Sequence, residues 1–338
     1  MTSKLVVICL LVAFGWAAVK SSDLGKVGDR FQKPKTPPSV RQVKILSEDE
    51  THRRVKHVLG ETEVPISPQR IASLSSAGTD SLLALGIKPV LATTSWMAEG
   101  SASYLAGRLK GVKLIRQAGS VNLEEILAAK PDLILANSRD ARLYGQLSKI
   151  APTVCLAADG SGDRENRILD LGDIVGRAAE ARARRDEYRR HVAEAKEALA
   201  AHAAGQPVVF LRFRRNTCVI YTQASMFGPL LFKQLGLTPD PTMPIAMTGG
   251  GWDVLSVERL STLQAEHIFM VIDPDSEVYL RQVMDTPIWK QLPAVQHDHV
   301  HRVASSTWLG GDGILGCEAI LADVLAAMIP TRSSDAIQ

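Results

Sequence analysis

Short apolar segments alternate with helical segments along most of the chain, and this alternation restricts the possible folds more than any other feature. A first series has predicted strands at 70–74, 90–93, 133–136 and 153–156, and helices at 80–85, 122–129 and 143–150. A second series has strands at 208–213, 219–221, 267–272 and 300–303, and helices at 229–235, 257–263 and 316–329. Short, almost wholly apolar strands between helices are typical of a mainly parallel sheet covered on both faces. We therefore predict an α/β fold with two lobes in sequence.

The segment 164–203 separates the two series and differs from both in composition. It is rich in Ala, Arg and Glu and contains no proline, so we predict one long helix of about 55 Å at 1.5 Å per residue. Neither lobe needs a helix of this length for its own core. We interpret it as a strut between the lobes. An ordinary surface helix would explain the composition but not the length.

The N-terminus has the pattern of a secretory signal peptide. Lys4 precedes an apolar run over residues 5–19, which is shorter than the ~20 residues that span a bilayer. We predict export and cleavage near Ala17 or Ala18. Acylation of Cys9 is the alternative that we consider weaker, because the apolar run continues well past it. The predicted organisation is signal peptide 1–18, flexible linker 19–54, N-terminal lobe 55–163, inter-lobe helix 164–203, C-terminal lobe 204–330 and tail 331–338.

Composition and motifs exclude several classes of function. The net charge of +3 over 338 residues gives no argument for a nucleic-acid partner. The chain has no GxSxG, no P-loop, no HExxH, and no GxGxxG after its first strand, so the usual acyl-transfer, phosphate and zinc chemistries lack their local motifs. We predict a binding protein rather than an enzyme.

The cysteines Cys155, Cys218 and Cys317 remain once the signal peptide is removed, and no CxxC occurs. We expect buried apolar side chains. A disulfide between Cys218 and Cys317 is left open for an oxidising compartment.

Several blocks of sequence, taken together, resemble one family. They are "RIASLSSAGTDSLLALGIKPVLATT", "GSVNLEEILAAKPDLILANS", "GWDVLSVERLSTLQAEHIFMVI" and "IWKQLPAVQHDHVHRVASSTWLGGDG". In this order they resemble the siderophore and vitamin B12 binding proteins of ABC importers, over about residues 55–330. The resemblance implies two Rossmann-like lobes with mainly parallel sheets joined by one long α-helix.

The resemblance also implies a function. A periplasmic, monomeric protein would capture a ferric siderophore in the cleft between its lobes and deliver it to the permease in the inner membrane, without an intrinsic cofactor. The alternative ligands are vitamin B12, another corrinoid, or haem.

The segment Leu211 to Arg215 contains the most informative local pattern. On a strand, Arg212 and Arg214 point to one face and Phe213 to the other. Two guanidinium groups in an apolar segment favour an anionic ligand, although solvated arginines on an edge strand are the alternative. In siderophore-binding relatives a matching Arg-x-Arg segment lines the cleft. We therefore predict that both arginines bind an anionic iron chelate.

The resemblance assigns further ligand contacts to loops after strands. On the first lobe these are Arg116 and, as the better candidate, Arg139. The tryptophans Trp96, Trp252 and Trp308 are predicted to form aromatic walls of the cleft, with core packing as the alternative.

One glutamate in each lobe matches the residues with which B12-binding relatives contact the permease. These are Glu124 in "NLEE" and Glu258 in "SVERL". Each lies in a predicted first helical turn, where an interaction with the helix dipole is the alternative. We predict docking, because equivalent carboxylates stand in both lobes.

The sequence His297-Asp298-His299-Val300-His301 could place three imidazoles on one face of a strand. The resemblance indicates a turn and a short strand here, and no Glu or Cys stands nearby in sequence. We therefore predict an exposed hairpin and no metal site.

Overall fold

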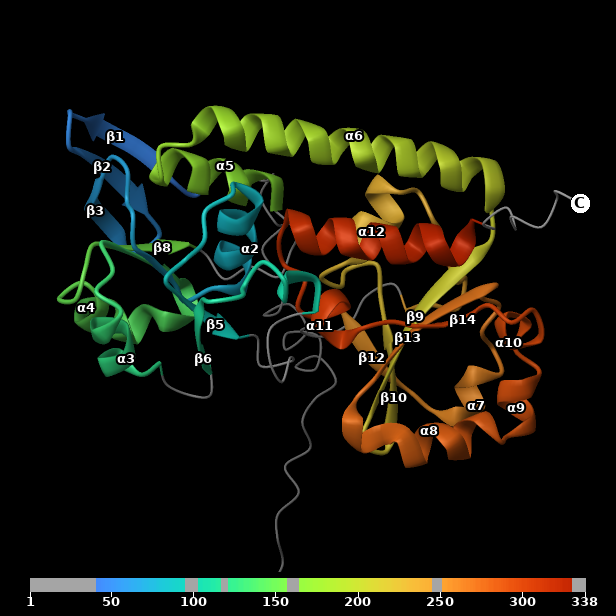
Figure 1. Cartoon of the computed structure of the whole chain (residues 1–338). Coiled ribbons are helices and arrows are strands. Elements are labelled where there is room, and N and C mark those ends of the chain that lie inside the picture. The colour runs from blue at the N-terminus through green and yellow to red at the C-terminus, as the bar shows by residue number, and fades with distance from the viewer. Residues whose placement is uncertain (1–40, 95–102, 117–120, 157–163, 245–250, 330–338) are drawn as a thin grey trace, which may run out of the picture. The chain divides into compact units, whose positions relative to one another are not determined.

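The computed structural model describes residues 41–94, 103–116, 121–156, 164–244 and 251–329 (Figure 1). The predicted signal peptide, Trp96, the C-terminal tail, and the predicted linker up to residue 40 lie outside these ranges.

The described chain opens with a three-stranded antiparallel sheet in the order β1-β2-β3. Its strands are β1 (Lys44–Glu48), β2 (His52–His57) and β3 (Gly60–Pro65). The prediction of a flexible linker over 19–54 is therefore wrong from Lys44 onward. Only alternate residues of β2 are buried, and two of them are Arg53 and His57. Because β2 has so few apolar residues, its composition resembles that of a flexible, solvent-exposed linker, and the sequence predicts a linker for this reason.

The second sheet is parallel throughout, with strand order β6-β5-β4-β7-β8. Its strands are β4 (Ile71–Ser73), β5 (Leu91–Thr94), β6 (Lys113–Arg116), β7 (Leu133–Asn137) and β8 (Thr153–Leu156). The helices of this half are α2 (Ser76–Ala84), η2 (Ser103–Leu105), α3 (Leu123–Ala128), η3 (Ser138–Leu143) and α4 (Tyr144–Leu147). Every residue of β4 and β7 is buried. This confirms the prediction of a parallel sheet covered on both faces.

The third sheet is mixed, with the order β12-β10-β9-β13-β14 and β11 paired to β9. Its strands are β9 (Pro207–Arg214), β10 (Thr217–Tyr221), β11 (Thr238–Pro239), β12 (Trp252–Leu255), β13 (His267–Ile272) and β14 (Val300–Arg302). Strands β9, β11, β13 and β14 are parallel, whereas β10 and β12 run antiparallel to their neighbours. Two residues connect β9 to β10, too few for the crossover that a parallel pair requires.

Helices complete this half of the chain. They are η4 (Pro229–Gln234), α7 (Val257–Leu260), η5 (Pro274–Ser276), α8 (Glu277–Met284), α9 (Pro287–Lys290), α10 (Pro293–Gln296), α11 (Ser305–Trp308) and α12 (Ile314–Met328). No helix among the described residues is both long enough and apolar enough to cross a membrane.

The predicted single helix over 164–203 is two helices, α5 (Arg164–Ile174) and α6 (Ala178–His202), which pack against each other. The break occurs at Gly176, whose φ of +75° favours glycine. A Cβ on Gly172 of α5 would overlap Ala181 of α6, so glycine permits their close approach. The longer helix α6 has 25 residues, about 37 Å at 1.5 Å per residue.

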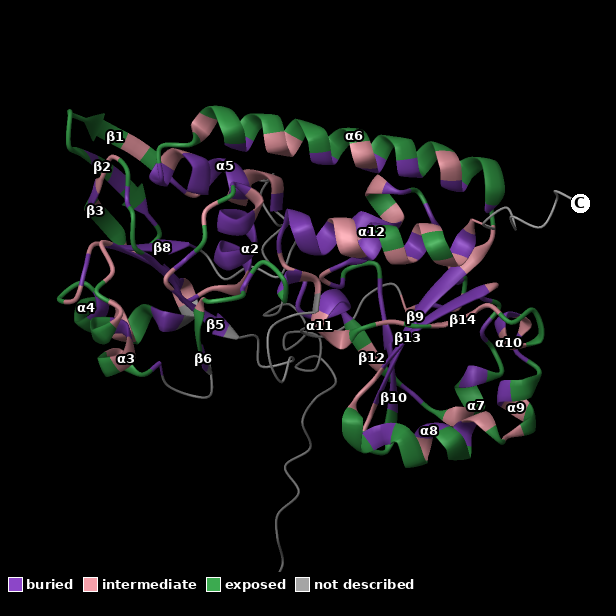
Figure 2. Ribbon diagram, in the orientation of Figure 1, coloured by how far each residue is buried: buried purple, intermediate pink, exposed green. Residues whose placement is uncertain are grey.

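One hydrophobic core is continuous from the parallel sheet to the mixed sheet. It includes Leu135 of β7 and Phe210 of β9, together with buried residues of α5, α6 and α12. In Figure 2 the outer surface of α6 is exposed, whereas α12 beneath it is largely buried. The inner stripe of α6 and the apolar helix α12 therefore connect the two halves of the chain.

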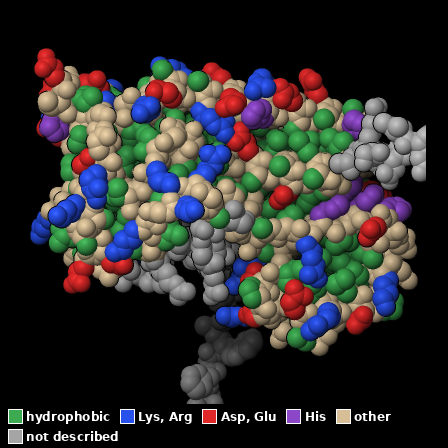
Figure 3. Space-filling view, viewed as in Figure 1, with side chains coloured by type: hydrophobic (Ala, Val, Ile, Leu, Met, Phe, Trp, Pro, Cys, Tyr) green, Lys and Arg blue, Asp and Glu red, His purple; other side chains and the backbone are tan. Residues whose placement is uncertain are grey.

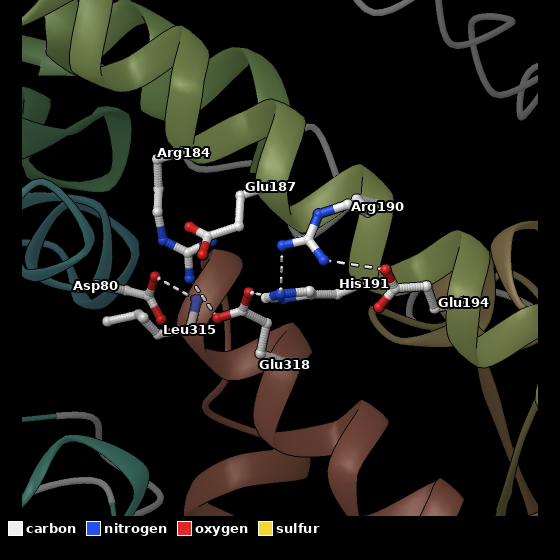
Figure 4. A network of polar contacts seen from close by, with 8 residues as sticks. All are labelled: Asp80, Arg184, Glu187, Arg190, His191, Glu194, Leu315 and Glu318. Atoms are coloured by element: carbon white, nitrogen blue, oxygen red, sulfur yellow. Dashed lines mark hydrogen bonds and ion pairs between the residues drawn. The ribbon is translucent and has the colours of Figure 1, made fainter.

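Polar contacts fix the N-terminal end of α12. The Asp80 carboxylate of α2 accepts hydrogen bonds from the backbone N–H groups of Leu315 at 3.1 Å and Gly316 at 2.9 Å. These groups have no partner within the helix, so an anion there also interacts favourably with the helix dipole. Glu318 of α12 contacts Arg184 and His191 of α6 (Figure 4). Burial raises the pKa of Asp80 to about 6, although the two backbone hydrogen bonds oppose this.

The cysteines Cys155, Cys218 and Cys317 are free and buried, which confirms the expectation of buried apolar side chains. Cys218 and Cys317 belong to separate core clusters and form no disulfide.

Candidate ligand-binding site

Arg212 and Arg214 lie on one face of the mixed sheet. Arg212 stands opposite Val219 of β10, which in turn stands opposite Val254 of β12. Directly opposed residues in antiparallel strands point to the same side. Phe213 points to the other side and belongs to a separate core cluster. The predicted alternation of this segment is therefore confirmed.

Exposed apolar side chains share this face. Trp252 stands opposite Tyr221, which stands opposite Phe210, two residues before Arg212. The exposed fraction of Trp252 is 40% and that of Val254 is 49%. We call Arg212, Arg214, Trp252 and Val254 the cationic face. It combines guanidinium groups with open apolar surface, which suits a ligand that has both anionic and aromatic or aliphatic groups.

Asp273 pairs with Arg212. The Nε of Arg212 donates to Oδ1 of Asp273 at 2.9 Å, and Nη2 donates to Oδ2 at 2.7 Å. The exposed fractions of the two side chains are 8% and 19%. Burial opposes the charge of Arg212, but hydrogen bonds to Asp273 and Tyr221 outweigh this and raise the pKa of Arg212. Arg212 is therefore charged and already has an internal counterion.

Asp273 is not among the residues predicted from the sequence, although its position after a strand marks it as a candidate. Asp273 directly follows the strand predicted over 267–272. That strand is parallel to β9, so the carboxyl ends of both strands meet at one edge of the sheet. Ligand sites of open α/β sheets lie at this edge.

Arg214 differs from Arg212 in its surroundings. It is the last residue of β9 and is half-buried. It makes no ion pair with any residue in the described ranges. Among the charged groups described on the cationic face, Arg214 therefore has the uncompensated charge.

Trp308 is not an open wall of a cleft. Its exposed fraction is 1%, and its ring stacks on Phe210 and Phe269 with centroid distances of 5.2 Å and 5.1 Å. Its Nε1 donates to Asp323 at 2.8 Å. Core packing, the alternative considered for this residue, accounts for Trp308. Phe210 points to the same side of the sheet as Arg212, so Trp308 packs beside the cationic face on that side.

The first-lobe candidates have described backbone positions. Arg116 ends β6, and Arg139 lies in η3 directly after β7. Both therefore follow the carboxyl ends of parallel strands. Their assignment to a ligand remains a prediction, as does that of Trp96 outside the described residues.

Glu124 and Glu258 occupy similar local positions. Each is exposed in the first turn of a short helix, α3 and α7, after an N-cap of Asn122 or Ser256. Hydrogen bonds from its own backbone N–H and from Ser256 lower the pKa of Glu258, so its carboxylate is ionised at neutral pH. Both carboxylates are accessible to a partner.

The segment 297–301 forms a turn and a short strand, as predicted, but no hairpin. Asp298 has a φ of 60° in the turn, and β14 pairs in parallel with β13. The preceding element is the helix α10, so the chain does not fold back on a neighbouring strand.

Comparisons with known proteins agree with this architecture. Residues 71–307 match the family described as "Periplasmic binding protein". The probable siderophore-binding lipoprotein YfiY of Bacillus subtilis is 29% identical, over 83% of this chain and 89% of that protein. The Fe(3+) dicitrate-binding periplasmic protein FecB of Escherichia coli is 29% identical, over 77% of this chain and 84% of that protein.

A solved structure gives the same result for the fold. Staphylococcus aureus SirA complexed with staphyloferrin B is 28% identical, with a TM-score of 0.66 over 80% of this chain and 97% of that chain. The match confirms the predicted two-lobed α/β fold, and the family confirms a binding protein rather than an enzyme. The chain therefore belongs to the periplasmic binding protein family.

Proposed function

We propose that this protein is the solute-binding component of an ABC importer and that its transported ligand is a ferric siderophore. The names of YfiY, FecB and SirA's bound ligand support this ligand class. The observation that carries the proposal is Arg214, a cation without an ionic partner among the described residues, on a face that also exposes Trp252. Arginine binds carboxylate and phenolate oxygens through several fixed donors.

The charge of this face favours an anionic chelate over vitamin B12. Cross-strand pairing brings Arg212 and Val254 within two strand spacings, about 10 Å. A ligand in this place can contact a guanidinium group and an apolar side chain at once. Haem has both carboxylates and an apolar ring, so it is retained as the second candidate.

Binding to a panel of iron chelates tests the proposal. The full chain is titrated with ferric citrate, ferric staphyloferrin B, cobalamin and haem, and tryptophan fluorescence is recorded. We expect quenching by a ferric chelate. Arg214→Ala should lower its affinity about tenfold to a hundredfold, because a hydrogen bond to a charged group contributes about 1.5–3 kcal/mol.

The matched control is Arg182→Ala, which removes an exposed arginine of α6. Equal affinity in Arg214→Ala and in this control would refute the role of the cationic face. The proposed ligand class would be refuted if cobalamin or haem bound to the protein and none of the ferric chelates did.

We further propose that Glu124 and Glu258 contact the permease, that residues 1–18 direct export to the periplasm, and that the protein acts as a monomer. The exposure of both carboxylates at helix N-termini supports the first point. Lipid attachment through Cys9 is the weaker alternative to a cleaved signal peptide.

A further inference from the structure

Four histidines gather where β13 and β14 begin, and the proposed transport function uses none of them. His267 is the first residue of β13, His297 and His299 lie just before β14, and His301 lies within it. A group of histidine side chains is visible on the face drawn in Figure 3. Arg212 lies beside Val271, four residues along β13 from His267, which is about 13 Å. The histidines therefore lie at the amino-terminal end of β13, whereas Arg212 lies near its carboxyl-terminal end.

Glu266 connects two of these histidines. Its Oε2 lies 2.9 Å from Nδ1 of His297, and its backbone carbonyl oxygen lies 3.2 Å from Nδ1 of His299. A carbonyl oxygen only accepts, so Nδ1 of His299 carries the hydrogen and its Nε2 has a lone pair. Each of Glu266, His297 and His299 offers a ligand atom within 4.8 Å of the other two.

The remaining histidines hold His299 in place. The His299 ring stacks on His267 with a centroid distance of 4.4 Å and an interplanar angle of 10°. His267 is itself fixed, because its Nδ1 lies 3.1 Å from Nε2 of His301 and its Nε2 lies 2.8 Å from Oε1 of Gln206. The carbonyl oxygen of Glu266, which accepts from Nδ1 of His299, is a hydrogen-bonded partner of the kind that orients imidazole ligands in metal sites.

We propose that Glu266, His297 and His299 bind a divalent transition-metal ion, with Zn²⁺ as the best match to the donor set. Two imidazoles and one carboxylate are donors that Zn²⁺ accepts, and water completes its coordination in open sites. The side chains of His297 and Glu266 are 55% and 33% exposed, so solvent and the ion can reach the site. Ligand atoms around tetrahedral zinc are about 3.4 Å apart. The candidate ligand atoms lie within 4.8 Å of one another, so binding would require the side chains to rotate toward this separation.

A bound ion would connect two segments of the mixed sheet. Glu266 immediately precedes β13, and His297 and His299 precede β14. The ion would therefore stabilise the pairing of these strands. A hydrogen-bonded cluster without a metal site predicts no effect of zinc on stability.

Zinc binding by the full chain, prepared without an affinity tag, tests the proposal. Competition with a chromophoric chelator measures Zn²⁺ affinity, and the visible absorption of bound Co²⁺ reports tetrahedral coordination. We expect one ion per chain and a higher melting temperature with zinc, since a ligand that binds only the folded state stabilises it. His297→Ala and Glu266→Gln should each lower the affinity at least about tenfold.

His52→Ala is the matched control, because it removes an exposed histidine of β2 far along the chain from the cluster. It should bind zinc as the unmodified protein does. Arg214→Ala should also retain zinc binding, which separates this proposal from the ligand proposal. The proposal is refuted if the unmodified chain does not compete with the chelator. It is also refuted if zinc binds folded Glu266→Gln and His297→Ala with unchanged affinity.

Discussion

Replacing Arg212 by alanine is expected to destabilise the ligand-free protein by about 3–5 kcal/mol, because it leaves the Asp273 carboxylate without its partner. This cost is larger than that of breaking an exposed ion pair, which contributes at most about 1 kcal/mol. The two side chains are 8% and 19% exposed and share two charge-assisted hydrogen bonds. Asp273→Ala should also destabilise the protein, since it removes the carboxylate that neutralises the buried guanidinium group of Arg212.

The double variant Arg212→Ala/Asp273→Ala removes both charges and therefore should cost less than the sum of the single changes. We expect a coupling energy of about 2–3 kcal/mol from a double-mutant cycle. Urea unfolding at neutral pH without ligand measures the four free energies of unfolding.

The exposed pair Arg54 and Glu61 provides the control cycle. Their charged atoms lie 2.9 Å apart, but the side chains are 59% and 38% exposed, so their coupling should stay below about 1 kcal/mol. Additive effects at Arg212 and Asp273, or a coupling no larger than that of the control pair, would contradict the reasoning.

Three further predictions follow from the anchoring of α12 and from the exposed glutamates. A rise in the pKa of Asp80 from 3.8 to about 6 on folding corresponds to about 3 kcal/mol. The stability that protonated Asp80 contributes is complete only well below pH 3.8 and is lost as the pH rises through 6. The unfolding free energy of the unmodified protein should therefore fall by about 2.5 kcal/mol relative to that of Asp80→Asn between pH 4 and pH 7; a pH-independent difference would rule this out. Gly313→Ala should lower stability by about 3 kcal/mol in urea unfolding, because its Cβ would overlap the Asp80 carboxylate, whereas Gly107→Ala meets no neighbour and should be nearly neutral. Glu124→Ala/Glu258→Ala should slow uptake of the iron chelate by cells without changing ligand affinity, in contrast to the α6 control Glu197→Ala, and normal uptake would remove the docking proposal.

The parallel sheet could be predicted because its strands are buried on both faces. Strands such as β7, with five buried residues, have a continuous apolar sequence. The first antiparallel sheet could not be recognised in this way. In β2 half of the residues are exposed and the buried ones include Arg53 and His57. Its stability depends on partners distant in sequence, such as the carbonyl oxygen of Asp173, which accepts a hydrogen bond from Arg53.

The break between α5 and α6 had a local signal that composition concealed. Gly176 follows an apolar pair and precedes Arg177, a position typical of a helix end. The alanine-rich sequence on the C-terminal side has high helix propensity, which favoured one continuous helix. The packing of Gly172 against Ala181 then decides the geometry, and packing between helices is not readable from propensity.

In the candidate sites, too, local sequence predicts which face a side chain points to but not its partners on other strands. The faces of Arg212 and Phe213 follow from the period of a strand, which is a local property. The pairing of Arg212 with Asp273 and the position of Glu266 beside His297 depend on how β9, β13 and β14 align. Glu266 lies 31 residues from His297, and no Glu or Cys stands beside 297–301 in sequence. Local sequence therefore predicts no metal site at these histidines.

The two arginines of β9 have different roles, because only one has a counterion. Arg212 and Asp273 together contribute no net charge, so the described side chains of the cationic face contribute a single positive charge, that of Arg214. A ferric chelate with several negative charges needs more cations than this. The predicted first-lobe arginines, Arg116 and Arg139, follow carboxyl ends of parallel strands, where such ligands bind. If these residues complete the site, the ligand's charge is shared between both lobes. A mutation of Arg214 alone then weakens binding without abolishing it.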